Sequence, residues 1–242
     1  MVQKTWRRSV MAIDFLRRLS DVLAPRACVI CSCRLAPTER MVCGSCLASI
    51  PFTGYEQEPT DNAMARLLWG HVQVERCAAL FFYKGGSAPA HAIYRLKYDN
   101  RPYIGTYLGT LTAQLFASTN FFEGMSHIVP VPLTNRRLRS RGYNQSEEIA
   151  RGVAEVTGLP VVCKALKRTT FSESQTHKDS WERWANVNEA FTPWKTAGLS
   201  GAHVLLVDDV MTTGATAAAC IAALIKGGVG QVSVLTLAVV KP

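Results

Sequence analysis

The sequence has no apolar run that approaches the ~20 residues a membrane-spanning helix needs. Residues 1–24 also lack the continuous apolar core of a secretory signal, because they are basic and Asp14 interrupts them. Internal repeats and low-complexity segments are absent. These absences argue against a membrane-spanning or exported protein and predict a cytoplasmic location.

Acidic side chains are few, with 18 Asp and Glu against 27 Lys and Arg, so the net charge is +9. An excess of this size favours anionic partners such as nucleotides, pyrophosphate or nucleic acid. It does not choose among them, and a solvated basic surface without a special partner is the alternative. The 242 residues, 48% of them hydrophobic, suffice for one α/β domain and a small appendage.

The first 24 residues carry apolar side chains at helical spacing, among them Ile13, Leu16 and Leu19. This spacing predicts a short amphipathic helix over residues 1–24. We expect this helix to pack on the body of the protein, and binding at a membrane surface is the alternative.

Four cysteines in two C-x-x-C pairs mark residues 25–55. The pairs are Cys28 with Cys31 and Cys43 with Cys46. Two such knuckles complete a tetrahedral thiolate site, so we expect a zinc-ribbon-like segment that holds one structural Zn²⁺. Cys33 offers an alternative ligand, but it breaks the paired spacing and is interpreted as a spectator. An iron–sulfur cluster is a weaker rival, and four reduced thiols without a metal are the remaining alternative.

A change in composition marks the domain boundary. Residues 51–62 are polar and contain two prolines, which predicts a linker before a larger domain over 63–242. Apolar patterns in that domain predict strands over 77–83 and 161–166 and helices over 90–97 and 104–116. The polar stretch at 169–188 is typical of a mobile lid, and His177 within it is interpreted as solvent-exposed.

The most informative stretch begins with four apolar β-formers at 204–207, which predict a buried strand of a parallel sheet. Asp208 and Asp209 follow the strand directly. A tight turn then leads into an Ala-rich helix over about 215–226, and a further apolar strand follows over 232–240. Strand, helix and strand at this spacing form a βαβ unit, which we expect to be right-handed.

The turn after the two acids has the composition of a phosphate site. Its residues are Thr212, Thr213, Gly214, Ala215 and Thr216. Backbone N–H groups at a helix N-terminus bind phosphate, and threonine hydroxyls add donors. Asp208 and Asp209 suit the 2- and 3-hydroxyls of a sugar, because a carboxylate accepts hydrogen bonds from vicinal hydroxyls. We therefore expect a ribose 5-phosphate here, and a structural turn with both acids merely exposed is the alternative.

A second anion site is expected after a short strand at 128–132, which prolines cut off. Four arginines follow in a strand-to-helix loop, namely Arg136, Arg137, Arg139 and Arg141. Arginine suits polyphosphate geometry, and the next helix begins at about Ser146. A solvated basic loop or a nucleic-acid contact is the alternative. Lys97, near the end of an earlier helix, either reaches a pyrophosphate or is simply solvated.

The 204–216 stretch resembles the phosphoribosyl pyrophosphate (PRPP) signature of type I phosphoribosyltransferases. Together with other motifs it is similar to the ComF family of competence-associated proteins. These motifs are the cysteine pairs, Leu96-Lys97-Tyr98, Val129-Pro-Val-Pro132, Arg139-x-Arg141-Gly-Tyr-Asn-Gln145, Gln175-Thr176, Arg183 with Asn186, and Ala190-Phe191. The resemblance covers about 28–240. It implies an α/β fold, with a five-stranded, mainly parallel sheet flanked by helices, a small hood over 77–116 and an N-terminal zinc ribbon.

The same likeness implies site residues. The PRPP loop corresponds to Asp208, Asp209, Thr212, Thr213, Gly214, Ala215 and Thr216. The pyrophosphate loop corresponds to Pro130, Val131, Pro132, Arg139, Arg141 and Gly142, with Lys97 facing the leaving group. The flexible loop corresponds to Gln175, Thr176 and Lys178. No residue identifies the acceptor substrate or a catalytic acid or base.

Two classes of function remain open. The resemblance implies a PRPP-binding protein that transfers a phosphoribosyl group and releases pyrophosphate, with Mg²⁺ holding the pyrophosphate. The alternative is an accessory factor without turnover in DNA uptake, which binds single-stranded DNA or partner proteins through the ribbon and the basic surface.

Overall fold

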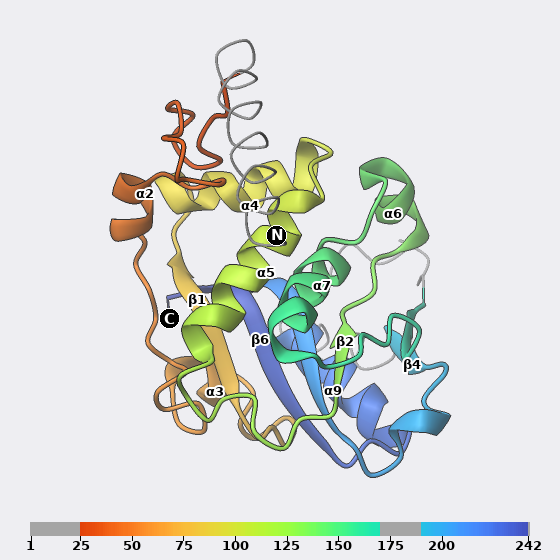
Figure 1. Ribbon diagram of the computed structural model, residues 1–242. Helices are drawn as coiled ribbons and strands as arrows, with labels where there is room; N and C mark the ends of the chain where they lie inside the picture. Colours follow the sequence, from red (N-terminus) through yellow and green to blue (C-terminus); the bar gives the residue numbers. More distant parts are fainter. Residues whose placement is uncertain (1–24, 170–189, 242) are drawn as a thin grey trace, which may run out of the picture.

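The computed structural model describes residues 25–169 and 190–241 (Figure 1). The helix expected over 1–24 and the expected lid residues Gln175, Thr176 and Lys178 lie outside this part of the chain. The elements, in chain order, are α2 (Gly44–Ala48), α3 (Ala63–Arg66), β1 (Cys77–Tyr83), α4 (Ala88–Tyr98), α5 (Tyr103–Phe116), β2 (His127–Pro130), α6 (Asn135–Arg141), α7 (Gln145–Thr157), β3 (Leu166–Arg168), β4 (Phe191–Pro193), η1 (Ala197–Leu199), β5 (His203–Met211), α9 (Ala215–Lys226) and β6 (Gln231–Val240).

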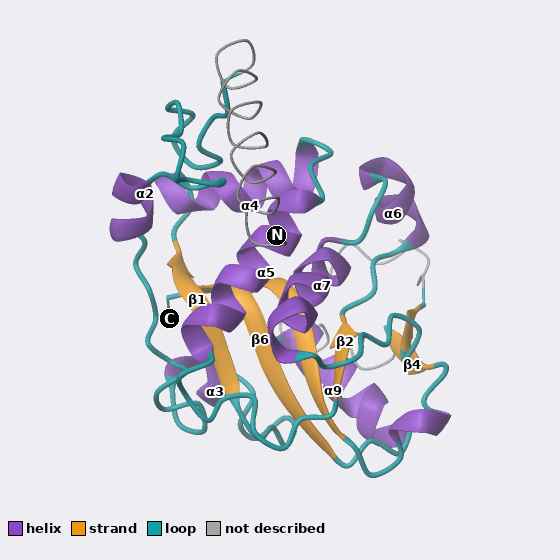
Figure 2. Cartoon of the chain, viewed as in Figure 1, coloured by secondary structure: helices purple, strands orange, loops and turns teal. Residues whose placement is uncertain are grey.

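A four-stranded sheet in the order β1-β6-β5-β2 forms the centre of the molecule, and every neighbouring pair in it is parallel. Helices cover both of its faces (Figure 2). Leu205 and Val207 pack in the cluster that contains α5 and α7, whereas Val204 and Leu206 pack in the cluster that contains α9. Alternate residues of a strand point to opposite faces, so both faces of β5 are buried. The expected class, a mainly parallel sheet flanked by helices, is confirmed.

The β5–α9–β6 unit differs from expectation in one respect that concerns the site. The strand expected over 204–207 extends from His203 to Met211 and contains both acids. Strand β6 provides the partners, since Asp208 lies opposite Thr236 and Met211 opposite Val239. The acids are therefore held in the sheet ladder rather than in the turn that follows it.

Two other expectations are wrong. The stretch 161–166 forms no strand of the main sheet: Val161 makes a single parallel bridge to Ile128, and β3 begins only at Leu166 and pairs antiparallel with β4. Within residues 25–169 and 190–241 the main sheet therefore has four strands rather than five. The expected hood over 77–116 is also absent as a separate unit, because β1 is the edge strand of the main sheet and pairs with β6.

Helices α5 and α7 cross at unusually close range. A Cβ atom built on Gly109 would lie 2.2 Å from the Ile149 carbonyl oxygen, and one on Gly152 would lie 2.0 Å from the Thr106 carbonyl oxygen. Only glycine permits such an approach of two backbones. The crossing fixes α7 against α5, and thereby places the N-terminus of α7 beside the end of β5.

The cysteine-containing loops pack on α4 and share its hydrophobic core. Cys28, Val29 and Ile30 are buried in the same cluster as Ile93 and Leu96 of α4. Polar contacts reinforce this packing: Arg95 Nη2 donates to Ser32 Oγ at 2.6 Å, and His91 Nδ1 lies 3.4 Å from the Ile30 carbonyl oxygen. The main domain therefore supports the fold of this small segment.

Candidate functional site

The junction of β5 and α9 has the backbone geometry of an anion site. Gly214 is the N-cap of the 12-residue helix α9 and has φ of +81°, a conformation that favours glycine. Thr212 and Thr213 are exposed, and the N-cap residue Gly214 offers no side chain to cap the helix. The Ala215 N–H donates to Thr213 Oγ1 at 3.4 Å, so the start of α9 combines backbone donors with two hydroxyls, an arrangement that suits phosphate.

The two acids have different partners. Asp208 Oδ1 accepts a hydrogen bond from Ser146 Oγ at 2.8 Å and another from the Asp209 backbone N–H at 2.8 Å. Asp209 Oδ1 instead forms an ion pair with Lys97 Nζ at 2.8 Å, and both side chains are mostly buried. Adjacent in sequence, the acids therefore join β5 to two different helices, α7 and α4.

Burial raises the pKa of Asp208 to about 7, and the neighbouring charge of Asp209 adds to the rise. The hydrogen bonds from the Asp209 N–H and Ser146, and the charge of Lys97, act in the opposite direction. Asp208 therefore changes its charge near neutral pH.

The expected pyrophosphate loop lies next to these acids. The Val131 N–H donates to the Val207 carbonyl at 2.9 Å, and Asn144 Nδ2 donates to the Val131 carbonyl at 3.0 Å. These bonds hold residues 130–132 beside the point where the carboxylates emerge. Gly142 follows α6 as its left-handed C-cap, with φ of +79°.

The four arginines lie on a helix, α6, and not in a loop as expected. Thr134 Oγ1 caps this helix by accepting from the Arg137 N–H at 3.3 Å, and none of the residues of α6 is buried. Arg139 is exposed. Arg141 donates to Gln145 Oε1 at 2.8 Å, and its guanidinium lies 5.4 Å from the centre of the Tyr98 ring. Arg141 is thus oriented, whereas Arg139 projects into solvent.

Sequence reasoning missed three residues here. Ser146 was noted only as a helix start, yet it holds Asp208. Gln145 is fully buried, and its Nε2 has no hydrogen-bond partner in the part of the chain that the structure describes. Arg168 is half-buried beside Phe191, and burial, followed by the charge of Arg137, lowers its pKa. The only signals in the sequence were the motif around Gln145 and the Lys167-Arg168 pair before the polar segment.

Lys97 lies where its ion pair with Asp209 brings α4 to the end of β5. Close by, the same helix presents an aromatic surface. Tyr94 and Tyr98 are 60% and 62% exposed, and their ring centres are 4.8 Å apart. Arg141 covers Tyr98 from the neighbouring helix, so this surface combines exposed aromatic rings with positive charge.

The cysteine loops bring four thiols together. The Sγ atoms of Cys28, Cys31, Cys33 and Cys43 all lie within 4.8 Å of one another. Cys33, interpreted above as a spectator, is thus part of the cluster. Cys46 lies next to the cluster, since its N–H donates to Cys43 Sγ at 3.4 Å, and burial raises the pKa of its thiol. All eight cysteines of the chain are free thiols.

The donor set of this cluster fits zinc. Hydrogen bonds from the Cys33 backbone and thiol lower the pKa of Cys31 to about 6, which favours the thiolate that a metal needs. The Ile30 and Cys43 N–H groups each donate to Cys28 Sγ at 3.4 Å, and the Cys46 N–H donates to Cys43 Sγ at 3.4 Å. Such bonds stabilise thiolate ligands in metal knuckles.

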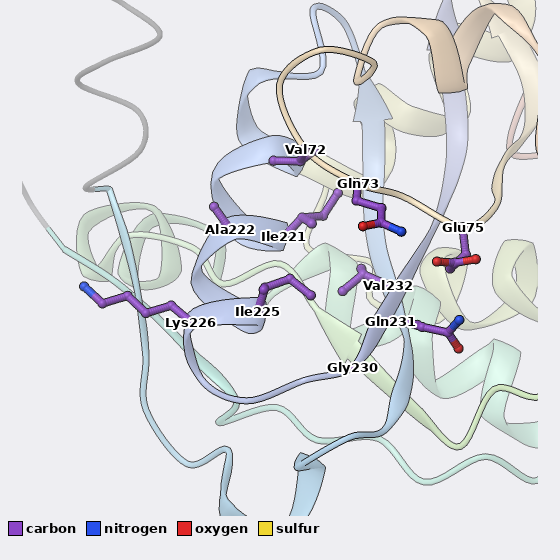
Figure 3. Close-up of a pocket in the computed structure, with 10 residues that line it drawn as sticks. All are labelled: Val72, Gln73, Glu75, Ile221, Ala222, Ile225, Lys226, Gly230, Gln231 and Val232. Carbon is purple, nitrogen blue, oxygen red and sulfur yellow. The ribbon is translucent and has the colours of Figure 1, made fainter.

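A separate hollow lies on the outer side of α9, with a volume of about 510 Å³ (Figure 3). Val72, Ile221, Ile225 and Val232 contribute apolar walls, and Glu75 lies at one side. It adjoins the first residues of β6, whereas Asp208 lies opposite Thr236 and the last residue of β5, Met211, lies opposite Val239. The hollow is therefore at the opposite end of the sheet from the candidate site.

Comparison with known proteins finds relatives named for DNA utilization and competence. No family model matches the chain. DNA utilization protein YhgH of Salmonella typhi is 30% identical over 148 residues, which cover 60% of this chain and 64% of that relative, a little under two thirds of its length. YhgH of Escherichia coli O6:H1 is 28% identical over 213 residues, covering 87% and 88%. Competence protein F of Haemophilus influenzae is 28% identical over 207 residues, covering 81% and 77%. These similarities agree with the resemblance to the ComF family.

Solved structures include a more distant likeness. Glutamine PRPP amidotransferase from B. subtilis is 21% identical and has a TM-score of 0.42, over 59% of this chain and 30% of the other. None of the helices in residues 25–169 and 190–241 is both long enough and apolar enough to span a membrane.

Proposed function

We propose that this protein binds PRPP or a ribose 5-phosphate at the carboxyl end of β5 and transfers the phosphoribosyl group to an acceptor. One observation carries the proposal: an exposed Thr212-Thr213 pair and the N-terminus of α9, whose N-cap is glycine, lie shortly after two carboxylates fixed in the sheet. The N-terminus suits the 5-phosphate, and the carboxylates suit the ribose hydroxyls. In an open α/β sheet, ligands bind at this edge.

Asp208 and Asp209 have different roles in this proposal. Asp209 is held by Lys97 and accepts the ribose hydroxyls once the ligand displaces the lysine. The freed ammonium then faces the pyrophosphate. Asp208 keeps one oxygen on Ser146 and the backbone, which leaves its second oxygen for the ligand. The site thus exchanges an internal ion pair for contacts with the substrate.

The reaction is a displacement of pyrophosphate from ribose C1, with an oxocarbenium-like transition state. Arg139, Arg141 and Arg168 provide positive charge for the leaving group, which Mg²⁺ accompanies when PRPP is bound. No acid or base is needed for the departure itself, so positioning and electrostatics carry the catalysis. The acceptor's nucleophilic atom forms the new bond to C1 as the bond to pyrophosphate breaks.

Calorimetry tests the proposal. Wild type titrated with PRPP and Mg²⁺ is expected to release heat, and Asp209→Asn is expected to weaken binding by about tenfold or more, because a carboxylate acceptor is lost. The matched control is Asp61→Asn, an exposed carboxylate that pairs with Arg66 and is expected to bind as wild type does. Absence of heat from wild type, or equal affinity of Asp209→Asn, would contradict the proposal.

A second candidate function rests on the surface formed by Tyr94, Tyr98 and Arg141. Exposed aromatic rings beside cations bind single-stranded nucleic acid, since bases stack on the rings. The relatives named for DNA utilization and competence agree with this role. Tyr94→Ser with Tyr98→Ser is expected to weaken binding of an oligothymidine strand at every salt concentration, whereas Tyr83→Ser, a half-buried tyrosine of β1, is not. Binding that is absent, or unchanged in the double variant, would remove this function.

The cysteine cluster is proposed to hold one structural Zn²⁺. Four thiolates leave no open position on the ion, so its task is to fix the fold of the cysteine loops rather than to take part in the reaction.

A further inference from the structure

We propose that the metal centre has two interchangeable fourth ligands. Cys28, Cys31 and Cys43 hold the ion throughout, and either Cys33 or Cys46 completes the tetrahedron. A zinc site of thiolates takes four ligands. The Sγ atoms of Cys28, Cys31, Cys33 and Cys43 already lie within 4.8 Å of one another, and Cys46 lies next to them because its N–H donates to Cys43 Sγ. The inference rests on the zinc role proposed above and adds which side chains supply it.

The first loop holds Cys33 in place as firmly as the paired cysteines. Residues 26–35 form a small hairpin in which the Cys28 N–H donates to the Cys33 carbonyl at 2.8 Å, and the Leu35 N–H donates to the Arg26 carbonyl at 2.9 Å. Ala27 and Arg34 form an antiparallel bridge. Cys33 is therefore tied opposite Cys28 by the backbone itself.

The residue between Cys31 and Cys33 adopts an uncommon conformation that brings the two thiols together. Ser32 has φ of +64°, which is costly for a side chain other than glycine, asparagine or aspartate. Its hydroxyl accepts from Arg95 Nη2 at 2.6 Å, which anchors this turn on α4. As a result the Sγ atoms of Cys31 and Cys33 are only 3.2 Å apart. A spectator cysteine would not require such a turn.

The second loop provides Cys46 as the other candidate for the fourth ligand. It lies in the short helix α2, one turn after Cys43, and its N–H donates to Cys43 Sγ. The residue is 8% exposed. Cys33, by contrast, is exposed. One candidate ligand thus approaches from the solvent side and the other from the core.

Cys28, Cys31 and Cys43, the three ligands common to both sets, are held in positions that suit a metal ion. Cys28 Sγ accepts from two backbone N–H groups. Cys31 and Cys43 come from different loops, and their Sγ atoms are 3.8 Å apart. Two thiolates at ~2.3 Å from one tetrahedral ion are separated by roughly the same distance. A fifth thiol next to such a set can bond to the ion as another leaves, so the ligands exchange while the ion stays in the protein.

Cobalt substitution tests the ligand set on the full chain. Co²⁺-loaded wild type is expected to show the absorption of four thiolates, and Cys33→Ser and Cys46→Ser are each expected to retain that spectrum with one ion per chain. The double variant is expected to show three thiolates and to bind the ion at least about 100-fold more weakly. Cys28→Ser, which removes a shared ligand, is expected to resemble the double variant, and Cys163→Ser, an exposed cysteine outside the cluster, is expected to match wild type.

The proposal is overturned if Cys46→Ser alone loses the four-thiolate spectrum, if Cys33→Ser alone loses it, or if wild type binds no ion. Cadmium NMR keeps the test decisive even where Cys46→Ser fails to fold. The wild-type cadmium resonance is expected to be doubled or shifted relative to that of Cys33→Ser, because wild type samples both ligand sets. Coincident resonances would show that Cys46 is the sole fourth ligand.

Discussion

At the scale of single residues, Asp208 and Asp209 show how differently two neighbouring acids are used. The sequence placed both after a strand and predicted similar contacts with a sugar. In the structure Asp208 accepts a hydrogen bond from Ser146, and Asp209 forms an ion pair with Lys97. Both partners are distant in sequence. Local pattern cannot supply such partners, because they depend on how α4 and α7 pack on the sheet. The identity of the acids was readable from the sequence, but their individual environments were not.

Asp208→Asn tests the consequence of its burial. The folded-state pKa of Asp208, about 7, is above the usual value of 3.8, so the carboxyl favours folding when protonated and opposes it when charged. This group's contribution to stability is present below about pH 4 and is lost as pH rises through about 7. The variant is therefore expected to exceed wild type in unfolding free energy at pH 8, on the order of 2 kcal/mol, and to match it at low pH.

Urea unfolding between about pH 4 and 8 measures this difference. Asp61→Asn, which removes an exposed acid, is expected to follow the wild-type curve. The prediction is contradicted if wild type has the larger unfolding free energy and its difference from Asp208→Asn grows with pH. That result would show that the charged form of Asp208 does not destabilise the fold.

Lys97→Met tests the exchange of the ion pair for substrate contacts. If the freed ammonium faces the pyrophosphate, the variant is expected to bind PRPP about tenfold more weakly and to bind ribose 5-phosphate at least as well as wild type. Titration of both ligands by calorimetry distinguishes these effects, with Lys84→Met as the exposed control. An equal loss for both ligands would indicate that Lys97 supports the fold of the site instead.

At the scale of elements, hydrophobic periodicity predicted most helices and strands. The helix expected over 104–116 is α5, that over 215–226 is α9, and the strand expected over 77–83 is β1. The failures have physical causes. Arginines that read as a loop form α6, because Thr134 and Gly142 cap a short helix there. Strand β5 extends beyond the apolar residues 204–207, because β6 pairs with it as far as Met211.

Gly109→Ala tests the close crossing of α5 and α7. The added methyl group would lie 2.2 Å from the Ile149 carbonyl oxygen. Because this oxygen belongs to the backbone, no side-chain rotation can relieve the clash. The variant is expected to lose about 3 kcal/mol or more of unfolding free energy. Gly85→Ala, where nothing lies within 4 Å of the new atom, is the matched control in thermal and urea unfolding. Equal stability of the two variants would mean that the helices separate freely.

At the scale of the whole molecule, the cysteine loops and the sheet share one hydrophobic cluster. The sequence predicted a thiolate site from spacing alone, but it treated Cys33 as idle because the spacing rule has no place for a third cysteine. The hairpin bonds that bring Cys33 into the cluster depend on three-dimensional packing against α4. The boundary expected at 51–62 remains a prediction.

Removal of the metal is expected to weaken the whole chain and not merely its first segment. A strong chelator should lower the thermal midpoint of wild type by at least about 5 °C, because Cys28, Val29 and Ile30 would lose their fixed positions against Ile93. The double variant Cys28→Ser with Cys31→Ser should show no response to the chelator. A wild-type midpoint that does not move would argue against a structural metal.

Helix α4 connects the two ends of the molecule that carry chemistry. Within two turns it contacts the Ile30 carbonyl through His91, Ser32 through Arg95, Tyr143 through the Leu96 carbonyl and Asp209 through Lys97. A helix advances about 100° with each residue. Inserting or deleting a single residue between His91 and Lys97 would turn one set of contacts away from its partners while the other stayed engaged. The number of residues in this part of α4 is therefore fixed. The side chains that contact the cysteine loops and the side chain that contacts Asp209 must keep the same angular relation around the helix axis.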